Sequence, residues 1–109
     1  MIQIFGTRSS QPTRAAERFF KERRVPVHLV DLHKKPMSPG EIKRFIDRFT
    51  LAALVDRENP DIKYLRLTDA DLVAKIEQDP KLLHLPLVRS TKILSIGHDE
   101  ASWKSMLAE

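Results

Sequence analysis

The stretch from Ile2 to Arg14, IQIFGTRSSQPTR, predicts a strand, a loop and the start of a helix. Its apolar run ends at Gly6, and Pro12 stands where a proline in the first helical turn costs no hydrogen bond. The first backbone N–H groups of a helix are unpaired and carry partial positive charge, so an α/β fold commonly places a ligand or reactive group at such a junction. The loop offers hydroxyls, an amide and guanidinium groups, but no thiol, carboxylate or imidazole.

The residues around this loop predict a βαβ unit. A first strand over Gln3–Phe5 leads to a helix that is capped by Ser10 or Gln11 and ends near Arg24. The segment Val27–Leu32, VHLVDL, is short, apolar and rich in β-branched residues, which is typical of a strand. We expect this strand to be buried on both faces and parallel to the first one.

The middle of the chain predicts helices. The sequence Ser38-Pro39-Gly40-Glu41 has the spacing of a capping box, and apolar residues follow at helical spacing. Leu51–Val55 suits a short helical turn, and Asp56–Asp61 is polar, contains proline and indicates a loop. A third helix is expected from a cap at Thr68 to Asp79-Pro80.

The end of the chain predicts a hairpin and a last helix. Two short apolar segments, Leu85–Val88 and Ile93–Ile96, flank a polar gap that suits a tight turn. The helix is expected over Asp99–Leu107, with four candidates for burial: Ala101, Trp103, Met106 and Leu107. The order is therefore βαβ, helices, ββα in one domain that covers residues 1–109.

Composition excludes several classes of protein. The 109 residues contain no cysteine, which rules out disulfides, thiolate metal sites and thiol redox chemistry by these residues. There is no apolar run long enough for a membrane span, and the N-terminus lacks the pattern of a secretion signal, so we expect a cytoplasmic protein. The histidines His28, His33, His84 and His98 share no ligand spacing, so no metal site is expected.

The net charge of +4, from 19 basic and 15 acidic residues, is mild. The basic cluster Lys21–Arg24 lacks the interleaved aromatic residues on which a single-strand binder stacks bases. We interpret it as a solvated helix end, where cations are favourable, and do not expect direct nucleic-acid binding.

Three separated segments are similar to the arsenate reductase and Spx-type regulator family. They are the opening strand and loop, the helix start SPGEIKRFI, and DPKLLHLPLV with its short helical turn, proline and strand. The closing segment IGHDEASWKSML also resembles that family. The resemblance implies an α/β, thioredoxin-like fold with a four-stranded mixed sheet and helices on both faces.

In that family the loop before the first helix carries a nucleophilic cysteine, and the regulators have a second one three residues later. The resemblance places Ser10 at the first position and Thr13 at the second. A helix N-terminus can bring the pKa of a thiol toward neutrality, but it cannot ionise a serine hydroxyl in this way. We therefore expect Ser10 to cap the helix and not to act as a nucleophile, although the sequence leaves His84 or His98 open as a distant base.

Other family residues do not carry over. Leu85 stands where the family usually has an arginine before the proline, and Arg57 matches the arginine of the family's middle loop only with a gap. We therefore expect the family's oxyanion-binding site to be lost. Weak anion or ligand binding at the loop stays a hypothesis, with seven candidate residues: Arg8, Ser9, Ser10, Gln11, Arg14, Pro86 and Arg89. For Arg8, Arg14 and Arg89, a solvated surface position is the simpler interpretation. By the resemblance, the bond between Leu85 and Pro86 is cis and Pro86 faces the Ser10 loop.

These observations leave three hypotheses open. The first is a thioredoxin-fold module without redox activity that binds a protein partner or a small ligand, as Spx-type regulators act by contacting the transcription machinery. The second is a protein that binds glutathione or an oxyanion and relies on an external thiol. The third is that Ser10 is an engineered replacement for cysteine, against which Thr13 and Leu85 argue.

Overall fold

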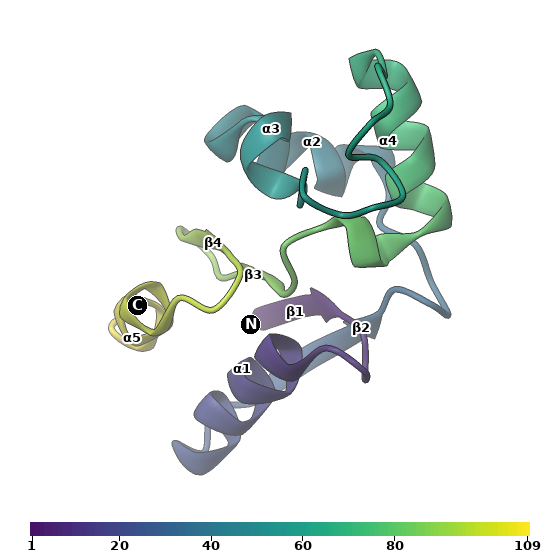
Figure 1. The fold of residues 1–109 in the computed structure, drawn as a ribbon. Coiled ribbons are helices and arrows are strands. Elements are labelled where there is room, and N and C mark those ends of the chain that lie inside the picture. Colours follow the sequence, from purple (N-terminus) through teal and green to yellow (C-terminus); the bar gives the residue numbers. More distant parts are fainter.

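The strand β1, Ile2–Gly6, lies inside a four-stranded sheet of order β2-β1-β3-β4 (Figure 1). It pairs in parallel with β2, Val27–Asp31, and antiparallel with β3, Leu87–Arg89. The strand β4, Leu94–Ile96, completes the sheet as the antiparallel neighbour of β3. The predicted mixed α/β sheet is confirmed.

The computed structural model describes all of residues 1–109. The remaining elements are helices, in chain order α1 Gln11–Glu22, α2 Pro39–Phe49, α3 Leu51–Leu54, α4 Asp69–Gln78, the 3-10 turn η1 Pro80–Leu82, and α5 Glu100–Leu107. No helix has the length and apolar character that a membrane span requires.

Two apolar clusters cover the two faces of the sheet, as the alternation of side chains along β1 dictates. Ile2 and Ile4 pack on one face with α1 and α5, where Trp103 is fully buried. Phe5 points to the other face, among residues of α2, α3 and α4, and meets the ring of Phe45 edge to face with centroids 6.3 Å apart. Figure 1 shows these two helical layers on opposite sides of the sheet.

The predicted helix starts are confirmed. Ser38 and Glu41 form the capping box at α2, and the Thr68 side chain accepts a hydrogen bond from Asp71 N at the start of α4. The short apolar segment after α2 forms α3, with Leu51 and Leu54 buried, and the polar segment after Val55 forms turns.

Three predictions of detail were wrong. The strand β2 is at the edge of the sheet, so its residues are only half-buried and His28 is exposed, instead of being buried on both faces. In α5 only Trp103 and Met106 are buried, since Ala101 and Leu107 turn toward solvent. The hairpin strands are shorter than predicted: β3 begins at Leu87, after Pro86, which has no N–H to donate to a strand, and β4 begins at Leu94.

Gly6 sets how closely α1 approaches the sheet. A Cβ atom placed on Gly6 would overlap the Oγ1, Cγ2 and Cβ atoms of Thr13, the third residue of α1. Thr13 is 1% exposed, and its hydroxyl has no hydrogen-bond partner. The end of β1 and the first turn of α1 are therefore packed directly against each other.

We predict that Gly6→Ala destabilises the protein by about 1–3 kcal/mol, the usual cost of an added group in a packed interior. Urea unfolding followed by circular dichroism measures the change. The matched control is Gly40→Ala, where no atom lies within 4 Å of the new Cβ and where stability should hold or rise. Adding Thr13→Ala to Gly6→Ala should recover part of the loss, and an unchanged midpoint for Gly6→Ala alone would contradict the close approach.

Candidate functional site

Ser10 is the N-cap of α1. Its side-chain oxygen accepts a hydrogen bond from Thr13 N at 3.3 Å, and its carbonyl accepts one from Arg14 N at 3.1 Å. The Ser10 N–H donates in turn to the carbonyl of Thr7 at 3.2 Å. The loop is thus folded onto the start of the helix by bonds that include both the backbone and the hydroxyl of Ser10.

A cleft of about 450 Å³ opens beside this cap. One wall is the loop with the first turn of α1, and the other walls come from the turn near η1, the segment before β3 and the junction between β4 and α5. Eleven residues line it: Thr7, Ser9, Ser10, Pro12, Asp56, Lys81, Leu83, His84, Leu85, Gly97 and His98. Segments far apart in the sequence therefore meet at the N-terminus of α1.

Backbone hydrogen bonds hold the far wall of the cleft in place. His84 N donates to the carbonyl of Leu54 at 2.8 Å, and Gly97 N donates to the carbonyls of His84 and Pro86, each at 3.0 Å. Gly97 has a φ of +66°, a left-handed conformation that glycine adopts without strain. The Leu85–Pro86 peptide bond is cis.

The cleft contains two of the seven candidate residues from the sequence, Ser9 and Ser10. Arg8 and Arg14 line a neighbouring hollow of about 410 Å³ on the other side of the loop. The Arg14 guanidinium donates a hydrogen bond to the carbonyl of Arg8 at 3.0 Å. Arg14 therefore stabilises the loop and does not line the cleft.

The other candidates lie outside the cleft. Arg89 pairs with Gln3 in the sheet and donates to its Oε1 atom at 3.3 Å, so it belongs to the end of β1 that is remote from the loop. Gln11 is exposed on the first turn of α1, and Pro86 is buried and contributes only its carbonyl. The structure thus does not bring Arg89 to the Ser10 loop.

Several residues of the cleft were missed as ligand-binding candidates. Lys81 and Asp56 lie in segments that the sequence predicts only as turn and loop. His84 and His98 were considered only as distant bases, although both line the same cleft as Ser10. The available signal was Pro86, which the family resemblance places opposite the Ser10 loop, whereas its neighbours His84 and Leu85 are the residues that line the cleft.

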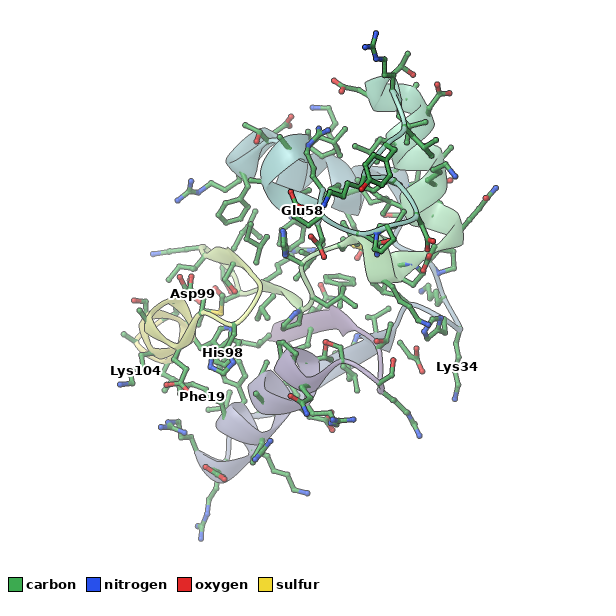
Figure 2. All side chains as sticks on the ribbon, viewed as in Figure 1. Phe19, Lys34, Glu58, His98, Asp99 and Lys104 are labelled. Atoms are coloured by element: carbon green, nitrogen blue, oxygen red, sulfur yellow. The ribbon has the colours of Figure 1, made fainter.

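His98 is held by neighbours from α5. Its ring lies 5.0 Å from that of Trp103, and its Nε2 atom is 3.4 Å from Glu100 Oε1. Figure 2 shows the His98 side chain on the α1 side of α5, near Phe19. The cleft therefore combines hydroxyls, one ammonium and two imidazoles with a single carboxylate, Asp56, a set that can hydrogen-bond an anionic or polar group.

No group of three or more His, Cys, Asp or Glu side chains lies close enough together to hold a metal ion.

The cleft has a small apolar part at Leu83 and Leu85. Leu85 is 8% exposed, because most of its side chain belongs to the core cluster that contains Phe5 and Phe45. The hydrogen-bonding groups thus gather around the cap, while the wall beside Pro86 is apolar.

The sequence profile of the ArsC family matches residues 5–106. The chain belongs to the ArsC family. Within this ArsC-family chain, the match covers the Ser10 loop, the cis-proline segment and α5. None of the curated proteins matches the sequence.

Solved structures share the fold of this ArsC-family protein. The YffB (PA3664) protein superimposes with a TM-score of 0.85 at 12% identity, over 98% of this chain and 99% of its own. An arsenate reductase from Vibrio cholerae gives a TM-score of 0.78 at 16% identity, over 94% of this chain and 95% of its own. An arsenate reductase (ArsC) related protein from Brucella melitensis gives 0.70 at 14% identity, over 99% and 95%. At these identities the likeness shows a common thioredoxin-like fold.

We predict that Ser10→Ala lowers the free energy of unfolding by about 1 kcal/mol, because α1 loses its side-chain cap. Ser10→Asp should keep most of the stability, since its carboxylate accepts the same bond from Thr13 N and is favourable at a helix N-terminus. Urea unfolding of both variants measures this. Equal losses for the two variants would show that the hydroxyl of Ser10 does not act as a cap.

Proposed function

We propose that this ArsC-family protein is a binding or regulatory module without redox activity, and that the cleft beside Ser10 holds an anionic group of its ligand or partner. The observation that carries the proposal is the role of Ser10. The residue at the position of the family's nucleophile is a serine whose hydroxyl caps α1, in a sequence that contains no cysteine.

Redox chemistry of the family type needs a thiolate that forms and breaks bonds to sulfur or arsenic. A serine hydroxyl has no accessible redox state, and it becomes a nucleophile only when a base takes its proton. Thr13, at the position of the second cysteine, is buried against Gly6 and is closed to solvent. Neither position supports thiol exchange, which favours binding over electron transfer.

The surroundings of the cleft support an anionic ligand. The first turn of α1 contains no acidic residue, so the partial positive charge of its N-terminus is not neutralised locally. Lys81 is exposed at the rim of the cleft and adds a full positive charge, while His84 and His98 supply ring nitrogens. Carboxylate and phosphate groups are the common biological partners of such a set.

A second candidate is a protein that binds glutathione or an oxyanion and takes its thiol from outside the chain. The volume of the cleft favours this candidate, because about 450 Å³ beside the cap is enough for a small peptide-like ligand. Glutathione carries two carboxylates, which suits the same polar lining. Its own sulfur would then occupy the place of the missing thiol.

We predict that a bound anion raises the melting temperature. Ligand at about ten times its Kd stabilises by about 1.4 kcal/mol, which is roughly 5 °C for a domain of this size. Thermal unfolding is measured with phosphate, sulfate, arsenate, reduced glutathione and S-methylglutathione, each against sodium chloride at equal ionic strength. Lys81→Gln should reduce the shift, whereas Lys34→Gln, an exposed lysine outside the cleft, should leave it unchanged.

Two results would contradict the proposal. If none of the anions raises the melting temperature above that in sodium chloride, the anion site in the cleft is wrong. If the protein reduces arsenate in the presence of glutathione, the claim of a module without redox activity is wrong and the second candidate holds. A shift with S-methylglutathione but no turnover supports binding without thiol chemistry.

A further inference from the structure

The net charge of the chain is concentrated in one segment. Residues 8–24, which comprise the loop end and α1, carry six of the 19 basic residues and two of the 15 acidic ones. The other 92 residues contain 13 of each, so the net charge of +4 belongs to residues 8–24. The excess of positive charge in this chain therefore lies in one short segment.

Three of these six basic residues lie on the outer face of α1. Arg14, Arg18 and Lys21 follow one another at i, i+4 and i+7, which places them on one side of the helix over a length of about 10 Å. All three are exposed, and the side of α1 that packs on the sheet is formed by other residues: Thr13, Ala16, Phe19 and Phe20. We call Arg14, Arg18 and Lys21, with Arg24 two residues after the end of the helix, the α1 basic stripe.

The stripe lacks carboxylate partners within the fold. Of the four ion pairs in the structure, the one that reaches residues 8–24 joins Arg8 to Asp31 at 4.0 Å. On α2, by contrast, Lys43 donates to Asp47 at 2.8 Å, a hydrogen bond that raises the pKa of the lysine. Because Arg18, Lys21 and Arg24 have no such partner, their charges are open to a partner molecule.

A groove extends the stripe toward the sheet. The groove has a volume of about 380 Å³, and six residues line it: Glu17, Lys21, Arg24, Val25, Pro26 and Val27. The valines are half-buried and offer apolar contact, and Val27 begins the edge strand β2. The groove thus places two cations and one carboxylate, that of Glu17, beside a short apolar surface, so its charged lining has a net charge of +1.

We propose that the α1 basic stripe and this groove form a docking surface for an acidic segment of a partner protein. Carboxylates of that segment would pair with Arg18, Lys21 and Arg24, and an apolar side chain would contact Val25 and Val27 in the groove. This surface lies apart from the Ser10 cleft, and none of its residues lines that cleft. Failure of the anion site would therefore leave this inference intact.

The distribution of acidic residues favours a protein partner over nucleic acid. Glu17 and Glu22 flank the stripe on its two sides and would repel the neighbouring phosphates of a polynucleotide backbone. The two aromatic rings of the segment, Phe19 and Phe20, are buried and cannot stack on bases. A narrow row of carboxylates on an extended or helical segment fits between the two glutamates.

The test measures binding of a fluorescein-labelled peptide of repeating Glu-Glu-Leu units by anisotropy at low ionic strength. Saturable binding that weakens with salt is expected, and the same peptide with Gln in place of Glu should not bind. Arg18→Gln combined with Lys21→Gln should weaken the Kd roughly fivefold to tenfold, since each exposed ion pair contributes a modest amount. The matched control is Arg44→Gln with Arg66→Gln, two exposed arginines far from α1 in sequence.

The melting temperature of both double variants should stay near that of the parent, because the changed side chains are exposed. Equal weakening by the two double variants would overturn the proposal, since general charge and not the stripe would then hold the peptide. Tighter binding of duplex DNA, single-stranded DNA or phosphatidylserine vesicles than of the acidic peptide would also overturn it, in favour of a nucleic acid or a membrane surface.

Discussion

The contact between Gly6 and Thr13 fixes the geometry on which the rest of the site depends. Because Gly6 has no side chain, the first turn of α1 lies directly on the end of β1, with Thr13 sealed in between. That approach determines where the loop folds back and where the N–H groups of α1 point. It also anchors the helix that presents the basic stripe on its opposite side, so a single close contact sets two surfaces of the molecule.

The cleft beside Ser10 is shaped more by backbone than by side chains. The loop is closed by the bonds of Ser10 to Thr7, Thr13 and Arg14, and the facing wall is closed by the bonds of Gly97 to His84 and Pro86. Such walls keep their form when exposed side chains are exchanged. The shape of the cleft therefore depends little on the exposed side chains that line it.

Local signals made most of the fold predictable from the sequence. The capping box at Ser38, the cap at Thr68, the proline in the first turn of α1 and the helical spacing of Phe19 and Phe20 act over a few residues, and the structure has each of them. The edge position of β2 could not be read in the same way, since VHLVDL is apolar enough for either a central or an edge strand. Its exposure is decided by strand order, which depends on β3, some 60 residues later.

The candidate site was less predictable, because it is assembled from segments without a motif. Ser9 and Ser10 were found through the loop, but Lys81, His84 and His98 reach the cleft only when the cis-proline segment and the β4–α5 junction fold beside it.

Leu85 belongs to the core and to the wall of the cleft at the same time. Its side chain is part of the hydrophobic core, and a charge placed there costs free energy unless it is paired. A change of residue 85 to arginine would therefore disturb the core cluster and the wall of the cleft together.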